Sequence, residues 1–490
     1  MNTQRPEWND ANNALVGTGV SMVTLYYLRR HLALCRDLFQ TLSGGDAAVS
    51  EEVADFLSGV MGTLHTHLLL LEGPLSDADR RKVLDGLGGA GSAYRTVLYA
   101  TGFSGQRRNL PGSALVEFTE LALRYVDHSI RANRRPDGLY HAYNLMQARE
   151  DGSISIRRLY EMLEGQAAVL SSGFLSPRES ADLLDALAES SLFRKDQSSY
   201  ILYPDRRLPG FMEKNHIPEK EFLGSELLKR LVRQGDSRIV RRDADGGLHF
   251  NGEFRNASML KAALEAVRED GLRELAERET PLVLGIFERM FDHESFTGRS
   301  GTFYKYEGLG CIYWHMVSKL CLAVQETVLR AHASGEPEAV REKLARHYEA
   351  IREGIGVHKP PDVYGAFPTD PYSHTPGFAG VQQPGLTGKV KEDIISRFGE
   401  LGIRILNGAI SFDPLLLARK EFLKSAGVFQ TFDLSGSAVS IPLAKGSLAF
   451  TFCQVPVVYH LSGERKIILK KENGEDEERP GLRLDRETSV

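Results

Sequence analysis

The sequence predicts a mainly α-helical protein with one excursion that contains a β-hairpin and with a small β-unit near the C-terminus. Three observations support this fold class. Apolar residues recur near a 3.6-residue period through most of the chain before Gly402. A segment rich in proline and aromatic residues interrupts that pattern near residues 200–255, and alternating strand-like stretches replace it after Gly402.

The composition is that of a globular chain large enough for more than one structural unit. It has 490 residues, 42% apolar and 26% charged. The formal net charge of -5 argues against a general nucleic-acid binder, which needs a basic surface. No segment approaches the roughly 18 apolar residues of a membrane helix, and the N-terminus lacks the apolar core of a signal peptide. The four cysteines are far apart, which favours reduced residues in a cytoplasmic protein without a structural zinc or other metal.

The first half of the chain indicates serial helices joined by short loops. The stretch "MVTLYYLRRHLALCRDLF" carries one apolar face, and "EVADFLSGVMGTLHTHLLLLEG" and "ALVEFTELALRYVDHSIRA" behave similarly. In "SPRESADLLDALAESSLF", Ser176 followed by Pro177 and acidic residues is typical of a helix start.

The excursion at about residues 200–255 begins with "YILYPDRRLPGFMEKNHIP". Next, "SRIVRRDADGGLHFNGEF" predicts a hairpin around an Asp-Gly-Gly turn. We expect the helices to return near Ala257 and to continue to about Ile355. The domain prediction is therefore one helical region over 1–405 with an insertion at about 200–255.

A long loop is expected from Gly356 to Gly385. Its thirty residues contain six prolines and five glycines, and loops of that length without regular structure are usually functional or disordered. Its aromatic residues, Tyr372 among them, favour an ordered loop that stacks on sugar rings or seals the mouth of a site. We expect a helix to follow, and its apolar face consists of Val390, Ile394, Ile395, Phe398 and Leu401.

A small β-unit is predicted over residues 406–470. The stretch "IRILNGAISFDPLLL" contains a tight turn at Asn407-Gly408, and several strand-like segments follow. In "KKENGEDEER", residues 470–479, eight of ten residues are charged, so we expect the tail over 471–490 to be disordered.

Three separated stretches resemble one family, the inverting cellobiose and chitobiose phosphorylases (glycoside hydrolase family 94 and its relatives). The first, "EWNDANNALVG", is similar to a D-W-N-D-x-x-N segment whose second aspartate is the general acid. The resemblance therefore implies that Asp10 is the general acid and that Trp8 contacts substrate. Glu7 stands where the family usually has aspartate.

The second stretch, "EGLGCIYWHMVSKLCLA" at residues 307–323, resembles the segment E-N-G-G-x-Y-x-H. The resemblance implies that His315 binds phosphate and that Glu307 contacts the acceptor sugar, with Tyr313 also at the substrate. Gly308 replaces the family's asparagine.

The third stretch, "PGLTGKVKEDIISRFGELGIRILNGAISFDPLLL", resembles the W-Y-T-G-S segment and the helix after it. The resemblance implies phosphate contacts from Thr387 and Gly388. Upstream, "DPYSH" is similar to an E-P-Y segment that leads to a phosphate-contacting glutamine, for which His374 and Gln383 are the candidates here.

The resemblance implies that the chain carries the later part of an (α/α)6 barrel and its C-terminal strands. In the family, the donor-sugar residues and an N-terminal β-domain precede the general acid, whereas nine residues precede Asp10. We therefore expect either a partner chain that supplies the missing barrel half or a truncated reading frame. An incomplete barrel exposes apolar helix faces, which also favours a homo-oligomer.

The chemistry implied is inverting cleavage of β-linked glucosides or oligosaccharides by inorganic phosphate, with sugar 1-phosphate as product and no other cofactor. One carboxylic acid protonates the leaving oxygen, and phosphate, already an anion, needs no base. Asp10 directly before an apolar-periodic helix also fits a simple N-cap, and Thr387 fits one as well. His315 and Lys319, four residues apart, share a side of their helix and could hold phosphate, although a surface histidine would show the same spacing.

Two alternatives stay open at this point. An inverting (α/α)6 hydrolase would need a second carboxylate facing Asp10, and Glu307 and Asp370 are the candidates. The chain could also be an inactive fragment or a sugar-binding subunit that needs a partner chain.

Overall fold

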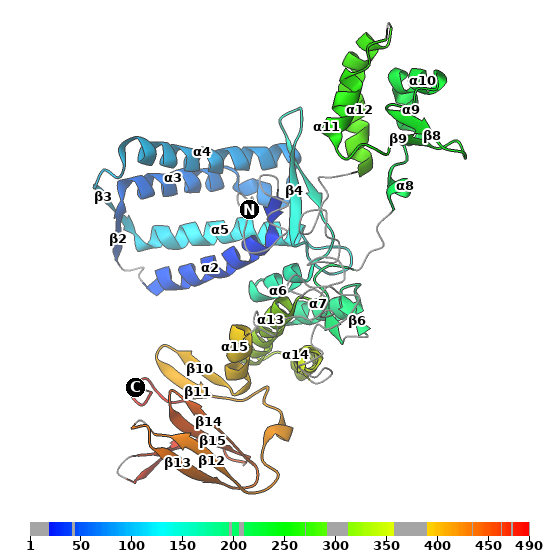
Figure 1. Ribbon diagram of the computed structural model, residues 1–490. Coiled ribbons are helices and arrows are strands. Elements are labelled where there is room, and N and C mark those ends of the chain that lie inside the picture. Colours follow the sequence, from blue (N-terminus) through cyan, green and yellow to red (C-terminus); the bar gives the residue numbers. More distant parts are fainter. Residues whose placement is uncertain are drawn as a thin grey trace.

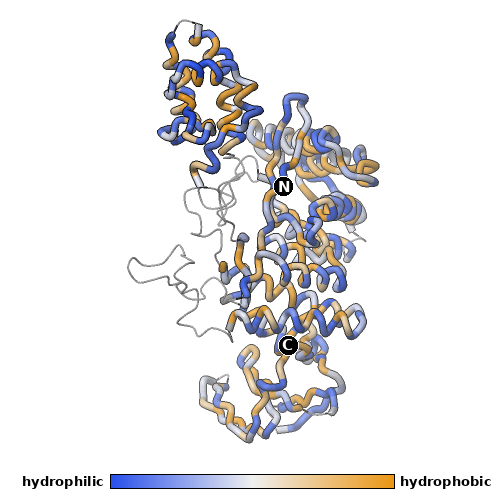
Figure 2. The backbone as a smooth tube through the Cα atoms, turned by 90° about the vertical axis from the view of Figure 1, so that its right-hand side faces the viewer, coloured by the Kyte–Doolittle hydropathy of each residue, from blue (hydrophilic) through white to orange (hydrophobic). Residues whose placement is uncertain are grey.

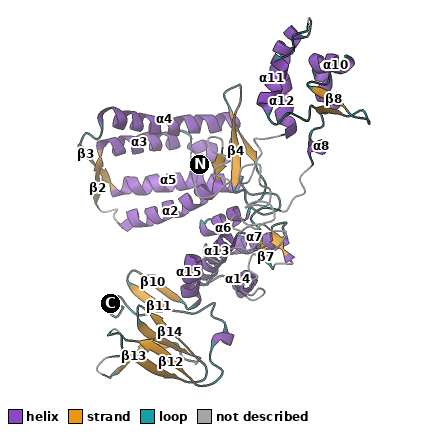
Figure 3. Cartoon of the chain, viewed as in Figure 1, coloured by secondary structure: helices purple, strands orange, loops and turns teal. Residues whose placement is uncertain are grey.

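The computed structural model describes residues 19–41, 45–195, 198–204, 210–269, 271–291, 312–356, 390–433, 435–461, 463–471 and 474–489. Helices dominate before residue 400, and short antiparallel strands are the main regular elements after it (Figure 3).

Four long helices lie side by side at the N-terminal end of the described chain (Figure 1). They are α2 (Met22–Thr41), α3 (Glu51–Thr66), α4 (Asp77–Thr101) and α5 (Gly112–Ala132). Ser50 and Ser76 cap α3 and α4, because each hydroxyl accepts the backbone N–H three residues on. An antiparallel ribbon of β2 (Asp46–Ser50) and β3 (Arg107–Pro111) lies where α2 passes to α3 and α4 to α5, and η1 (Leu68–Glu72) follows α3.

We call the region formed by these four helices and by the helices within residues 163–189 and 314–356 the helical body. A three-stranded antiparallel sheet joins the four long helices to the rest of this body. Its order is β1 (Gly19–Ser21), β4 (Tyr143–Ala148) and β5 (Ile154–Arg158). The Tyr26 hydroxyl of α2 donates to the carbonyl of His141 at 2.7 Å, just before β4. The sheet is therefore fixed against α2, and its chain continues into the central helix of the body.

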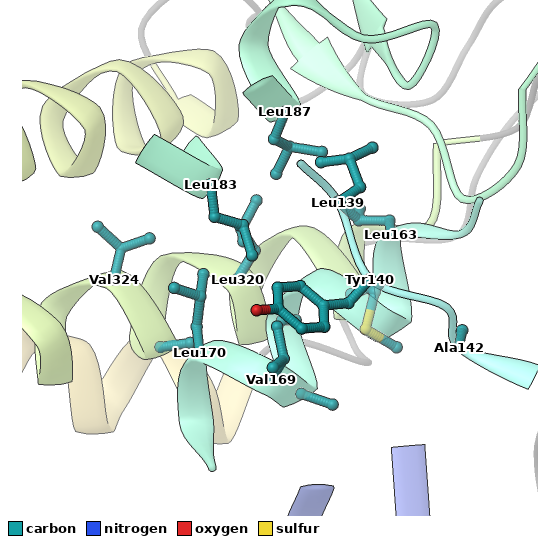
Figure 4. Packing of buried hydrophobic residues seen from close by; sticks show 14 of the residues in the cluster. Leu139, Tyr140, Ala142, Leu163, Val169, Leu170, Leu183, Leu187, Leu320 and Val324 are labelled. Atoms are coloured by element: carbon teal, nitrogen blue, oxygen red, sulfur yellow. The ribbon is translucent and has the colours of Figure 1, made fainter. Parts of the chain in front are cut away.

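The main hydrophobic core surrounds α6 (Leu163–Ser171). Every residue of α6 from Leu163 to Leu170 is buried, which is typical of a central helix. Figure 4 shows residues of α6, α7 and α13 packed against the segment at Leu139–Ala142. Helix α6 packs against α2, α7 (Pro177–Glu189) and α13 (Trp314–Ala333), and α14 (Glu338–Gly356) packs on α13 and α7. The short ribbon of β6 (Phe193–Arg194) and β7 (Ser199–Tyr200) lies beside α7 and α14. The helix start expected at Ser176 is confirmed, since Ser176 and Glu179 form a capping box.

Helix α15 (Val390–Glu400) packs on α13 with its polar side inward. Its buried side chains are Glu392, Ser396 and Glu400, four residues apart. Of the apolar residues that the sequence placed on one face, Ile394 is 51%, Ile395 50% and Phe398 41% exposed, whereas Leu401 is buried. The polar stripe of α15, which sequence analysis did not single out, is the one that contacts the body.

Residues 210–291 form a separate region with its own hydrophobic core, which stands apart from the helical body in Figure 1. We call it the outer domain. Its helices are α8 (Phe211–Lys214), α9 (Glu219–Gly224), α10 (Glu226–Arg233), α11 (Ala257–Glu265) and α12 (Arg273–Phe291). The hairpin expected around Asp-Gly-Gly is formed by β8 (Val240–Arg242) and β9 (Leu248–Phe250), with Gly246 in the left-handed region at φ +88°.

The outer domain extends further along the chain than the excursion expected at 200–255. Glu279 of α12 accepts hydrogen bonds from the Ser225 hydroxyl at 2.8 Å and from the Leu227 N–H at 3.0 Å, at the start of α10. Phe287 of α12 contacts the ring of Phe250 in β9. Residues from Ala257 to Phe291 therefore belong to the core of this domain, although their helical periodicity alone resembled a continuation of the body.

The C-terminal region is a set of antiparallel hairpins. They are β10 (Ile403–Leu406) with β11 (Ala409–Phe412), β12 (Gly427–Phe432) with β13 (Ala438–Leu443), β14 (Ser447–Phe452) with β15 (Val455–His460), and β16 (Lys466–Lys470) with β17 (Asp476–Pro480); η6 (Arg419–Glu421) lies between the first two. The predicted turn at Asn407-Gly408 is confirmed, because both residues have positive φ, as a two-residue hairpin requires.

The charged tail differs from the expectation of disorder over 471–490. Residues 476–480 form β17, and Lys466 contacts Glu478 at 2.9 Å while Lys471 contacts Glu477 at 2.7 Å. Farther on, Leu484 is buried. The alternating charges thus pair across a ladder, which composition alone did not reveal.

Hydrophobic and hydrophilic residues alternate along the described helices (Figure 2). Within the described ranges, none of the helices is both long and apolar enough to cross a membrane.

Candidate active site

Of the residues singled out from the sequence, Tyr313, His315 and Lys319 lie in the described part of the chain. The others lie outside it: Trp8, Asp10, Glu307, Asp370, Tyr372, His374, Gln383, Thr387 and Gly388. The expected convergence of Asp10, His315 and the Thr387-Gly388 pair on one site therefore stays a prediction.

His315 and Lys319 lie at the start of α13. The helix begins at Trp314, whose side chain is buried, and the carbonyl of Tyr313 accepts the N–H of Met316 at 2.8 Å. The Tyr313 ring meets the His315 ring edge-on, with centroids 5.8 Å apart. His315 and Lys319 are one turn apart on α13, as their spacing predicted, and both are partly buried.

His315 faces a carboxylate that sequence analysis missed. Its Nε2 lies 3.3 Å from Oε1 of Glu392, at the start of α15. The side chains of His315 and Glu392 are 16% and 5% exposed, so the contact is shielded from solvent. Lys391 Nζ lies 3.8 Å from the same carboxylate oxygen.

The electrostatic surroundings hold His315 uncharged near neutral pH. Burial, and next the charge of Lys319, lower the pKa of His315 below its usual 6.5, while Glu392 acts in the opposite direction. Burial also lowers the pKa of Lys319. Both shifts reflect the cost of placing positive charge in a poorly solvated site, and an anion bound here would remove part of that cost.

A second buried carboxylate lies near Lys319. Glu164, at the start of α6, is 4% exposed and accepts a hydrogen bond from the Tyr143 hydroxyl at 3.0 Å. Burial, and next the charge of Glu164, raise the pKa of Tyr143 well above its usual value. The sequence did contain a signal for Glu164, since it is an acidic residue in the otherwise apolar and small stretch "MLEGQAAVL".

The other oxygen of Glu392 has no hydrogen-bond donor among the described residues. Oε2 is buried, whereas most buried polar atoms in proteins are hydrogen-bonded. Such an orphaned atom calls for a functional explanation, because leaving it without a partner costs about 1–3 kcal/mol.

The arrangement provides donors and positive charge for an oxyanion. The N-termini of α13 and α15 meet where His315 contacts Glu392, and helix N-termini favour anions. Lys319 and Lys391 add two ammonium groups beside them. The buried carboxylates Glu164 and Glu392 can accept hydrogen bonds from neutral hydroxyl groups. Phosphate and sugar are both compatible with such a set of side chains.

Comparison with known families gives a match that covers the outer domain. Residues 208–294 match the model described as "GH149 phosphorylase insertion domain 2". A comparison with curated proteins finds no match. The family match supports an enzyme of a glycoside phosphorylase family, and it does not point to family 94 in particular.

Proposed function

We propose that the protein cleaves β-linked glucosides or oligosaccharides by inverting phosphorolysis and releases a sugar 1-phosphate. The observation that carries this proposal is the pair His315 and Lys319 at the meeting point of two helix N-termini. The insertion-domain match supports it independently, because that domain is named for phosphorylases.

In the proposed reaction, a phosphate oxygen forms a bond to the anomeric carbon as the glycosidic C–O bond breaks on the opposite face. Asp10, assigned by resemblance, gives its carboxyl proton to the leaving oxygen. His315 and Lys319 hold the phosphate and offset its charge, with Thr387, Gly388 and His374 as further proposed contacts. Glu164 accepts a hydrogen bond from a sugar hydroxyl near Lys319.

The direct test measures phosphate dependence. The full chain is incubated with β-linked gluco-oligosaccharides with and without inorganic phosphate, and sugar 1-phosphate and reducing sugar are both quantified. We expect sugar 1-phosphate to form only with phosphate. Asp10→Asn should lower the rate about a hundredfold or more, as expected for loss of a general acid.

His315→Gln should raise the KM for phosphate about tenfold, because one charge-assisted hydrogen bond is lost. His65→Gln is the matched control, since His65 is a half-exposed histidine paired with Glu117 on the α3–α5 side of the body. Equal release of reducing sugar without phosphate would instead indicate an inverting hydrolase. Binding of oligosaccharide without turnover would indicate a sugar-binding subunit.

A further inference from the structure

Helix α15 is held on the body by a buried polar contact along its whole length. Near its C-terminal end, the Glu400 carboxylate accepts from the Tyr348 hydroxyl at 2.6 Å and contacts Arg352 Nε at 2.8 Å. Midway, Gln325 Nε2 of α13 donates to the carbonyl of Ser396 at 2.7 Å. Glu392, two turns before Glu400, therefore has its position relative to α13 fixed by a rigid element.

Burying the polar stripe of α15 while Ile394, Ile395 and Phe398 remain half exposed is energetically unfavourable by itself. Departures from the usual pattern are expected where function requires them. The N-terminal residue of that stripe, Glu392, is the one that contacts His315.

We propose that Glu392 is a positioning residue for the oxyanion site: it accepts the Nε2–H of His315, so that Nδ1 takes a proton from solvent and donates it in a hydrogen bond to the bound oxyanion. This inference rests on the phosphorolytic function proposed above. The proton balance is simple, because one proton enters the imidazole from solvent when the anion binds and leaves when it departs.

The charged groups that face His315 make it responsive to an anion. Lys319 from its own helix and Lys391 from α15 disfavour the imidazolium, and Glu392 from α15 favours it. Glu164 from α6 acts on Lys319, and the Tyr313 ring contacts the imidazole edge-on. Burial keeps the pKa of His315 low in the absence of ligand, so a phosphate dianion is the added charge that shifts the balance toward the protonated ring.

The first experiment needs no ligand. The titration of His315 is followed by NMR in the full chain with isotope-labelled histidine, and His315→Gln identifies its signal. We expect Glu392→Gln to lower the pKa of His315 by about one unit, because the charge that favours the imidazolium is lost. Asp393→Asn is the matched control, since it removes the neighbouring charge from the same helix turn, and it should change this pKa far less.

The second experiment titrates inorganic phosphate by calorimetry in two buffers of different ionisation enthalpy near neutral pH. We expect the wild type to take up close to one proton per phosphate bound and Glu392→Gln to take up less than half of that. Asp393→Asn should behave as the wild type. If Glu392→Gln does not fold, Glu392→Asp serves instead, because it keeps the charge and shortens the reach to His315.

The outcomes separate the two proposals. An unchanged His315 pKa or unchanged proton uptake in Glu392→Gln overturns the positioning role and leaves phosphorolysis standing. If the wild type binds no phosphate but Glu392→Gln still lowers the His315 pKa, the phosphate site is overturned. The positioning of His315 by Glu392 is then still supported.

Discussion

The helical body and the outer domain each contain a histidine that contacts a carboxylate, and the two histidines are shifted in opposite directions. In the body, His315 lies 3.3 Å from Glu392, and burial lowers its pKa. In the outer domain, His249 Nε2 lies 2.7 Å from Asp243 Oδ2, and that hydrogen bond raises the pKa of His249.

The difference comes from the surroundings. Asp243 is 34% exposed in the β8–β9 turn, so the carboxylate remains well solvated, and His249 Nδ1 also bonds the carbonyl of Asn215. Glu392 is 5% exposed, and Lys319 stands beside His315. The outer-domain pair is thus a satisfied structural contact, whereas the body pair keeps a histidine uncharged until another charge arrives. A histidine–carboxylate distance alone does not identify a functional pair.

The prediction with the largest expected effect tests whether the helical body and the outer domain unfold independently. Phe287→Ala removes a ring that is 2% exposed in the outer domain, and it should destabilise that domain by about 4 kcal/mol. Hydrogen exchange should accelerate across residues 210–291 and stay unchanged in α6 and α13. Equal acceleration in both regions would mean that they unfold as one unit, and the comparison would lose its basis.

The next largest effect concerns Glu400, which attaches the C-terminal end of α15 and so helps to hold Glu392 against His315. Glu400→Ala leaves the buried Tyr348 hydroxyl without its acceptor, while Arg352 and Arg397 keep Glu421, and should cost the body about 2 kcal/mol. Since α15 then loses its C-terminal attachment, the effect of Glu392 on the NMR titration of His315 should weaken as well. Glu353→Ala, at a half-exposed carboxylate 3.9 Å from Lys420, is the control and should change neither quantity appreciably.

The smallest effect is a pair of opposite pH dependences. The pKa of folded His249 lies above 6.5, so its contribution stabilises the outer domain below pH 6.5 and is lost as the pH rises through the folded value. The pKa of folded His315 lies below 6.5, so the body loses stability as the pH falls from 6.5 through the folded value. Region-resolved hydrogen exchange against pH measures both slopes.

Matched variants assign those slopes. Asp243→Asn should flatten the pH dependence of the outer domain alone. His315→Gln should make that of the body less steep, and the slope that remains comes from His141, whose burial lowers its pKa to about 4. Parallel slopes in the two regions of the wild type would contradict the assignment of opposite shifts.

Sequence patterns were sufficient where local chemistry decides structure. The capping box at Ser176, the Asn407-Gly408 turn and the shared side of His315 and Lys319 follow from spacings of a few residues. Each depends on backbone geometry that is set by residues close together in the sequence.

Sequence patterns were insufficient where packing against another part of the chain decides which face of an element is buried. The apolar residues of α15 were visible, but only the packing against Gln325, Tyr348 and His315 shows that a polar stripe is buried. Glu392 was therefore missed as a site residue, and Glu164 was missed because its partners come from distant segments. Likewise, the periodicity of residues 257–291 identifies helices without showing which core they join.

The outer domain owes its core to one uninterrupted stretch, whereas the residues that flank it, Tyr203 and Ile312, are both buried in the core of the body. A domain built this way can be gained, lost or exchanged in evolution as a single gene segment without a change in the core of the helical body. A relative that lacks it could therefore keep the same central helix and the same pair of facing side chains. Searches for such relatives would gain from aligning the two parts of the body across the gap.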